Sequence, residues 1–127
     1  MERLRILSGS PFEATVGYSR AVVSGPHVFV SGTAPTMPEG ADPPADAYGQ
    51  ARRCLEIILA ALQEAGARAE HVVRTRIYLI PGVGFEGAGR AHAEVFAEIR
   101  PANTTVVVHS LLDSRWLLEI EADALLD

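Results

Sequence analysis

The stretch from Leu117 to Leu126 has the clearest pattern in the chain. Apolar and polar residues alternate along it with a period of two, which predicts a strand with one face on a hydrophobic core. The apolar face carries Leu118, Ile120, Ala122, Ala124 and Leu126, and the opposite face carries Glu119, Glu121 and Asp123. Neighbouring like charges repel unless water, cations or hydrogen-bond donors compensate them. The acidic face is therefore either solvated surface or the wall of a polar site.

Other short stretches rich in β-branched or aromatic residues also predict strands. Their ranges are Arg3–Leu7, Tyr18–Val23, His27–Ser31, Val72–Ile80 and Thr104–His109. The second and third flank Ser24-Gly25-Pro26 and should form a hairpin. Strict alternation in the fourth places Val73, Thr75, Ile77 and Leu79 on one side and Val72, Arg74, Arg76 and Tyr78 on the other.

Two segments show the spacing of amphipathic helices. The first follows a Pro-rich loop over residues 33–46, with Asp46 at the N-cap, Gln50 near the capping-box position and Gly66 at the end. Its apolar face carries Tyr48, Ala51, Leu55, Ile58, Leu59 and Leu62. The second helix follows a loop over residues 81–84 and is closed by Pro101; its apolar face carries Phe85, Ala88, His92, Val95, Phe96 and Ile99.

The order strand-strand-strand-helix-strand-helix-strand-strand predicts an α+β fold in one domain, residues 1–127. We expect a single mixed sheet with both helices packed on one face. The other face is then bare, and Arg74, Arg76 and Tyr78 should share it with the acidic stripe. Such a face is either buried by association or left in contact with water.

Composition narrows the classes of function. The chain has 11 Lys plus Arg, all of them arginine, and a net charge of −5 with a pI of about 5.3, which argues against nucleic-acid binding. Cys54 is the single cysteine, so no intramolecular disulfide is possible, and His27, His71 and His109 lack ligand spacing. His92 lies on the apolar face of the second predicted helix, which favours a packed, hydrogen-bonded histidine. We expect no metal and no cofactor. With neither a charged-then-apolar leader nor an apolar run of about 18 residues, we expect a cytoplasmic protein without a membrane partner.

An ordered set of short motifs resembles the RidA/YjgF/L-PSP family. The motifs are Gly17-Tyr18-Ser19-Arg20-Ala21-Val22, Val28-Phe29-Val30-Ser31-Gly32, residues 50–66, residues 72–78, Pro101-Ala102 and Leu118-Glu119-Ile120-Glu121-Ala122. The resemblance implies a chorismate-mutase-like fold and a homotrimer with ligand clefts between subunits. It also implies a hydrolytic chemistry, because deaminating members convert enamines and imines such as 2-aminoacrylate to 2-keto acids and ammonia.

The same resemblance supplies candidate site residues. Active members carry an arginine after the Pro-Ala dipeptide, where it binds the substrate carboxylate, and this chain has Asn103 there. Asparagine provides no charge and no planar fork for a carboxylate. The position where active members often carry cysteine holds Thr105. The glutamate that positions water corresponds to Glu119, which we name as the candidate catalytic residue; the candidate substrate-binding residues are Tyr18, Ser31, Thr33, Asn103, Thr104 and Thr105.

Each of these residues also has a structural interpretation. Glu119 either orients water or pairs with an arginine across the sheet, and Asn103 either binds a ligand or satisfies backbone groups at a strand start. Ser31 and Thr33 either flank a glycine where the backbone approaches a ligand closely, or are explained by turn chemistry alone. Whether the protein is an enzyme stays open: a trimeric small-metabolite protein with hydrolase activity is one hypothesis, and a non-catalytic ligand-binding or regulatory protein is the other. Ribonuclease activity is disfavoured by the acidic charge.

Overall fold

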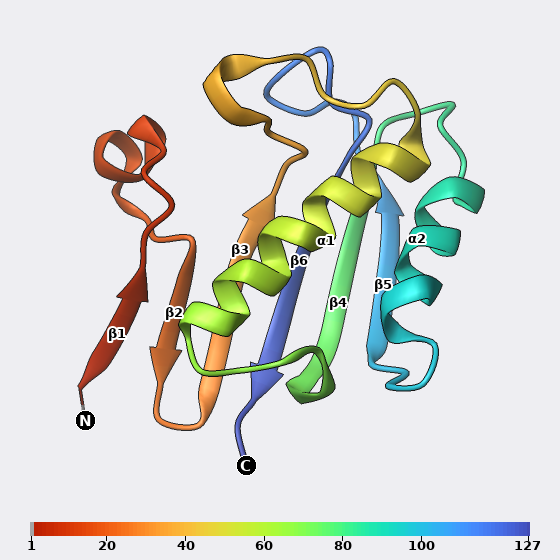
Figure 1. Cartoon of the computed structure of the whole chain (residues 1–127). Coiled ribbons are helices and arrows are strands. Elements are labelled where there is room, and N and C mark those ends of the chain that lie inside the picture. Colours follow the sequence, from red (N-terminus) through yellow and green to blue (C-terminus); the bar gives the residue numbers. More distant parts are fainter. Residues whose placement is uncertain (1) are drawn as a thin grey trace.

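The structure, a computed structural model, describes residues 2–127 and consists of one six-stranded sheet with two helices across one face (Figure 1). The strands are β1 (Arg3–Ile6), β2 (Ala21–Ser24), β3 (His27–Thr33), β4 (Val72–Leu79), β5 (Ala102–Val107) and β6 (Leu118–Leu125). The helices are α1 (Ala47–Glu64) and α2 (Glu86–Phe96). Three short turns complete the chain: η1 (Glu13–Gly17), η2 (Pro38–Gly40) and η3 (Ala69–His71). The predicted element order and α+β class are confirmed.

The sheet order is β1-β2-β3-β6-β4-β5, so the C-terminal strand lies in the middle of the sheet. It pairs antiparallel with both β3 and β4, whereas β4 and β5 are parallel and joined through α2. The sheet is therefore mixed, as expected. Two neighbours flank the acidic stripe of β6, while β5 forms one edge of the sheet.

Helix α1 begins where its sequence indicates, because the Asp46 carboxylate accepts a hydrogen bond from the Gly49 N–H at 2.8 Å. It ends before Gly66, whose φ of 84° is readily adopted by a residue without Cβ. The expected capping-box role of Gln50 is wrong. Its side chain is buried and makes long-range hydrogen bonds instead, donating to the Arg115 carbonyl and accepting from the Leu117 N–H.

Two expectations about burial fail for local geometric reasons. The register between β4 and β6 shifts between Val72 and Arg74, so β4 holds one extra residue there. The bulge turns Val72 into the core at 3% exposure and leaves Val73 outside at 48%, the reverse of strict alternation. Phe85 precedes α2 and is half exposed, because its ring lies against Gly89 on the outside of the helix rather than in the core.

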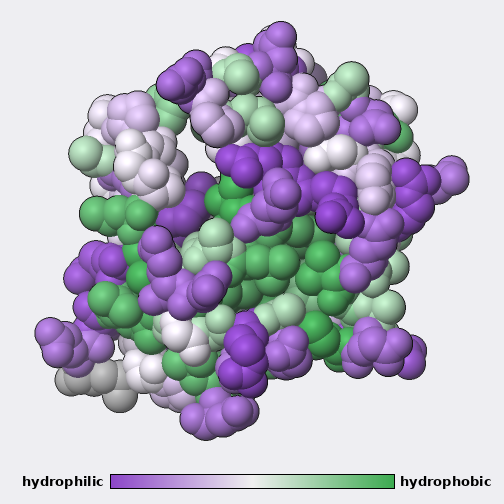
Figure 2. Space-filling view, viewed as in Figure 1, coloured by the Kyte–Doolittle hydropathy of each residue, from purple (hydrophilic) through white to green (hydrophobic). Residues whose placement is uncertain are grey.

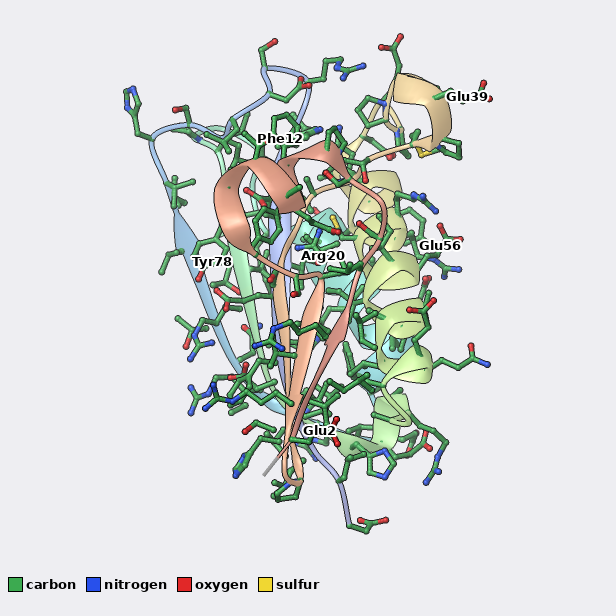
Figure 3. The ribbon with its side chains drawn as sticks, turned by 90° about the vertical axis from the view of Figure 1, so that its left-hand side faces the viewer. Glu2, Phe12, Arg20, Glu39, Glu56 and Tyr78 are labelled. Atoms are coloured by element: carbon green, nitrogen blue, oxygen red, sulfur yellow. The ribbon has the colours of Figure 1, made fainter. Side chains whose placement is uncertain are left out.

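The bare face of the sheet carries the expected charges. Register pairs Arg74 with Asp123, Arg76 with Glu121 and Tyr78 with Glu119. The guanidinium of Arg76 lies 3.5 Å from both Glu121 and Asp123, and the Tyr78 hydroxyl donates to Glu121. Figure 3 shows Tyr78 on the side of the sheet away from α1. The stripe is thus internally compensated, except at Glu119. No helix among residues 2–127 is long and apolar enough to cross a membrane.

Candidate functional site

The candidate site begins at an irregularity between β3 and β6. Val30 pairs with Ala122 but Thr33 pairs with Ile120, so the register shifts across Ser31 and Gly32. A Cβ placed on Gly32 would lie 3.4 Å from the Glu119 Oε1 atom. Glycine therefore allows the Glu119 carboxylate to approach the β3 backbone closely.

Arg20, which directly precedes β2, contacts the same glycine from the other side. Its Nη2 donates a hydrogen bond to the Gly32 carbonyl oxygen at 2.7 Å. Its Cζ lies 5.9 Å from the centroid of the Tyr18 ring, within the range of a cation–π contact. Tyr18, Arg20, Gly32 and Glu119 thus form one group, which we call the Arg20–Glu119 cluster. The structure brings together two of the predicted site residues here, Tyr18 and Glu119.

The two charged members of this cluster have unusual surroundings. Burial raises the pKa of Glu119 above its ordinary value, and the positive charge of Arg20 partly opposes that rise. No ion pair forms between them within the described residues, since none of the salt bridges of residues 2–127 involves Arg20. The Nε of Arg20 is buried and has no hydrogen-bond partner among these residues. Both groups therefore keep capacity for a further contact.

Two hollows lie beside this cluster. A cavity of about 210 Å³ is bounded by Arg20, the end of β1 and one face of α1; its lining includes Ile6, Ser8, Arg53, Glu56 and Ala61. A second, of about 390 Å³, is lined by residues of the segment 7–18, Tyr18 among them. Figure 2 shows the surface hollowed at the upper left, between the segment preceding β2 and the rest of the molecule. Two members of the cluster, Arg20 and Tyr18, thus line hollows that open to the surface.

Ser31 and Thr33, also predicted to bind substrate, use their hydroxyls on the backbone. Ser31 Oγ donates to the Ser19 carbonyl at 2.7 Å, and Thr33 Oγ1 donates to the Ser31 carbonyl at 2.8 Å. Thr33 is fully buried. These bonds stabilise the irregular stretch that holds Gly32, so their contribution to the site is positional. A direct contact of either residue with substrate stays a prediction.

The other predicted residues, Asn103, Thr104 and Thr105, lie apart on the edge strand β5. Asn103 Nδ2 donates to Thr75 Oγ1 at 3.0 Å, and Asn103 Oδ1 accepts from Thr105 Oγ1 at 2.9 Å. Strand β4 separates β5 from β6, so one chain does not bring Asn103 and Glu119 together. A site containing both needs residues from two copies of the chain.

His92 joins this edge network from helix α2. Its Nε2 lies 2.8 Å from Thr75 Oγ1, and its ring packs 4.7 Å from that of Phe96. Burial lowers the pKa of His92, which favours the neutral ring. The interpretation of His92 as a packed, hydrogen-bonded histidine is confirmed. Residues 2–127 contain no group of three or more His, Cys, Asp or Glu side chains arranged to hold a metal ion.

Arg20 was not among the site residues predicted from the sequence. It stands inside the Gly17–Val22 motif, next to the candidate Tyr18, and is the one charge in the predicted strand 18–23. That position could have drawn attention to Arg20. The unpartnered Nε and the contact with Gly32 could not be predicted from the sequence, because both depend on the pairing of β3 with β6.

Known proteins resemble this chain in both sequence and fold. The model of the family described as Endoribonuclease L-PSP matches residues 9–126. A RutC family protein of Pyrococcus abyssi is 38% identical over 108 residues, covering 84% of each chain. A crystal structure of a YjgF/YER057c/UK114 family member from Mycobacterium tuberculosis superposes with a TM-score of 0.89 at 42% identity, covering 98% of this chain and 100% of that one. The structure of E. coli TdcF with bound serine superposes with a TM-score of 0.80 at 27% identity, covering 97% and 94%.

Proposed function

The chain belongs to the endoribonuclease L-PSP (RidA/YjgF) family, and from this we propose that it forms a homotrimer and hydrolyses a small enamine or imine in clefts between subunits. The observation that carries the proposal is the Arg20–Glu119 cluster. A half-buried carboxylate with a raised pKa lies beside an exposed backbone glycine, and its cluster partners Arg20 and Tyr18 line the two hollows. A raised pKa makes a carboxylate a stronger base than an ordinary glutamate, which suits it to accept a proton from water.

In the proposed reaction Glu119 acts on water. For the imine of pyruvate, the Glu119 carboxylate accepts a proton from water as the water oxygen bonds to C2. Glu119 passes this proton to the imine nitrogen, which becomes the amine of a carbinolamine. Glu119 then accepts the proton of the new hydroxyl group and delivers it to the amine nitrogen, so that the C2 carbonyl forms, ammonia leaves and the carboxylate is regenerated. One imine and one water yield one 2-keto acid and one ammonia.

Assembly supports the same proposal. The open sheet face exposes Phe29 at 49%, Val106 at 42% and Leu125 at 44%, which is an unusual amount of apolar surface for one small sheet. A neighbouring subunit that covers this surface would also bring its β5 edge, with Asn103, towards another copy. Light scattering is expected to give about three times the 13.6 kDa chain mass; a monomeric mass contradicts the trimer.

The test of the reaction is ammonia release from 2-aminoacrylate generated by a separate enzyme. We expect the wild type to exceed the spontaneous rate and Glu119→Gln to lose about 100-fold or more, which is the usual contribution of an acid–base group. Glu70→Gln, an exposed change of the same charge on η3, serves as the control. A wild-type rate equal to background rejects the hydrolase.

One observation favours a second candidate, a non-catalytic ligand-binding protein. The Asn103 amide donates from Nδ2 to Thr75 Oγ1 and accepts at Oδ1 from Thr105 Oγ1, so it lacks the charge of a carboxylate clamp and part of its hydrogen-bonding capacity is already used. The related TdcF was crystallised with serine, so a small amino acid is a reasonable probe ligand. A thermal shift with serine but no ammonia release would support binding without turnover.

A further inference from the structure

We propose that Arg20 is the residue that binds the carboxylate of the ligand in this chain, taking over the task for which Asn103 has no charge. The inference rests on the proposed function, because Arg20 belongs to the Arg20–Glu119 cluster on which that function is based. It assigns the anion contact to the start of β2 rather than to β5.

The hydrogen bonding of Arg20 carries the first step. A guanidinium has five N–H donors, and within the described residues Arg20 makes one side-chain hydrogen bond, from Nη2 to the Gly32 carbonyl. The buried Nε has no partner there. A buried donor without an acceptor is costly unless something else supplies the acceptor. The side chain is thus held by one bond, and its remaining N–H groups have no acceptor among the described residues.

The neighbouring charges carry the second step. Arg53 lines the same 210 Å³ cavity, but its guanidinium is occupied, because Nε donates to the Thr36 carbonyl at 2.7 Å and Nη1 lies 3.5 Å from Glu56. The charge of Arg20 opposes the rise in the Glu119 pKa, but none of the salt bridges of residues 2–127 involves Arg20. Arg20 is therefore the arginine of this cavity without a salt bridge among the described residues, in a cavity that Glu56 and Glu64 also line.

The cavity indicates the class of ligand. At about 210 Å³ it is smaller than the range of roughly 300–1,000 Å³ that holds drug-sized molecules. Its walls near Arg20 include the apolar side chains of Ile6 and Ala61. A planar guanidinium matches a carboxylate with two parallel hydrogen bonds. These features fit a monocarboxylate of a few carbon atoms with a short apolar end.

The binding experiment uses pyruvate as the probe and pyruvamide as its neutral analogue of similar shape. Isothermal titration calorimetry compares the wild type with Arg20→Gln, Arg20→Lys and the control Arg5→Gln. Arg5 is exposed on β1 and gives the same change of charge. We expect Arg20→Gln to weaken pyruvate binding about tenfold or more and to remove the preference over pyruvamide. Arg20→Lys should fall between, and Arg5→Gln should match the wild type.

A labelling experiment on the wild type avoids dependence on how the variants fold. Phenylglyoxal modifies arginine, and peptide mass spectrometry reports each site separately. We expect pyruvate to slow modification of Arg20 and to leave Arg5 unaffected. Equal effects on both arginines, or no effect on either, overturn the assignment, as does unchanged pyruvate affinity in Arg20→Gln or absence of pyruvate binding to the wild type.

The outcomes separate this inference from the proposed reaction. Ammonia release by the wild type with unchanged pyruvate affinity in Arg20→Gln rejects Arg20 and leaves the hydrolase standing. Arginine-dependent pyruvate binding without ammonia release does the opposite, keeping the carboxylate contact and rejecting turnover.

Discussion

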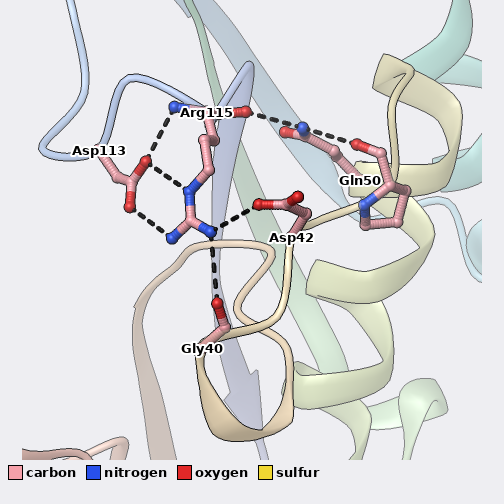
Figure 4. Close-up of polar contacts among 6 residues, drawn as sticks. Gly40, Asp42, Gln50, Asp113 and Arg115 are labelled. Atoms are coloured by element: carbon pink, nitrogen blue, oxygen red, sulfur yellow. Dashed lines mark hydrogen bonds and ion pairs between the residues drawn. The ribbon is translucent and has the colours of Figure 1, made fainter.

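Arg115 and Arg20 show two ways in which this small domain uses an arginine. Arg115 donates to both oxygens of Asp113, from Nε at 3.1 Å and Nη2 at 2.9 Å, and its Nη1 reaches Asp42 at 3.1 Å and the Gly40 carbonyl at 3.4 Å (Figure 4). Arg20 makes one side-chain bond and keeps a buried, unpartnered Nε. A saturated guanidinium holds loops together, whereas an unsaturated one retains capacity for a ligand.

Gln50 extends the region around Arg115 into the core. Its Nε2 donates to the Pro44 and Arg115 carbonyls at 2.9 and 3.0 Å (Figure 4). Its Oε1 accepts from the Leu117 N–H at 2.8 Å. This ties the loop before α1 to the entry of β6. We call Asp42, Gln50, Asp113 and Arg115 the loop clasp. The side chains of the loop clasp find hydrogen-bond partners within the clasp and the neighbouring backbone, whereas the Arg20–Glu119 cluster leaves the Arg20 Nε without a partner.

The largest expected effect is on stability, at Gln50. Gln50→Ala leaves two partly buried backbone carbonyls and one partly buried N–H without partners, each of which costs about 1–3 kcal/mol unless water replaces the side chain. We expect the free energy of unfolding in urea to fall by about 3 kcal/mol. Gln63→Ala, an exposed change on the same helix, is the control and should alter it by less than about 0.5 kcal/mol. Equal losses in both variants would show that the clasp is not structural.

The next effect concerns Glu119 and tests the cluster directly. Burial raises its pKa and the Arg20 charge lowers it, so Arg20→Gln should move the Glu119 titration to still higher pH. Arg115→Gln should leave it unchanged. Carbon-13 NMR of the Glu119 carboxyl measures this without any activity. An identical Glu119 titration in the wild type and Arg20→Gln contradicts the coupling.

If Glu119 is the catalytic base, its raised pKa should also appear in the pH dependence of the rate of ammonia release. The carboxylate is the active form, so ammonia release should decline as pH falls through the raised pKa of Glu119. Stability should change in the opposite direction. A raised carboxyl pKa means that the folded state binds the proton more tightly than the unfolded state, so the free energy of unfolding declines as pH rises from the unfolded pKa to the folded pKa. Glu119→Gln should remove that decline in urea unfolding measured across pH 4 to 8.

A smaller effect on stability is expected when the exposed part of the loop clasp is removed. Arg115→Gln removes contacts to Asp42 and Asp113 on exposed side chains, so global stability should change little. The loop over residues 38–44 should instead become more accessible, with faster proteolytic cleavage there. Because Arg20 does not hold this loop, the Arg20→Gln variant should be cleaved there at the wild-type rate. Faster cleavage in both variants would remove the distinction between the two arginines.

The smallest effect is a pH dependence confined to acid. Hydrogen bonds from Arg115 lower the pKa of Asp113 to about 2. A depressed carboxyl pKa stabilises the folded state above the unfolded value, near 4, and that contribution is lost as pH falls towards 2. Asp113→Asn should therefore show a shallower loss of stability between pH 4 and 2 than the wild type. Parallel curves would mean that the pair does not contribute.

The sequence predicted the layers of the fold well and the site only in part. Alternation in residues 117–126 and the apolar spacing of α1 fix which side of each element faces the core, since burial follows side-chain periodicity. The bulge at Val73 could not be predicted, because an extra residue in β4 is defined only relative to the register of β6. The contact of Arg20 could not be predicted for a similar reason, because its partner Gly32 lies across the hairpin in an irregular stretch.

By itself the sequence determined the element order, the single mixed sheet, the acidic stripe and the absence of an arginine after Pro101-Ala102. Only the tertiary structure decided which polar groups are satisfied. It put Asn103 in contact with Thr75, closed the loop clasp around Arg115 and left Arg20 with an unpartnered donor beside Glu119. The physical reason is that periodicity is local, whereas a hydrogen-bond partner for a side chain comes from strands and loops distant in sequence.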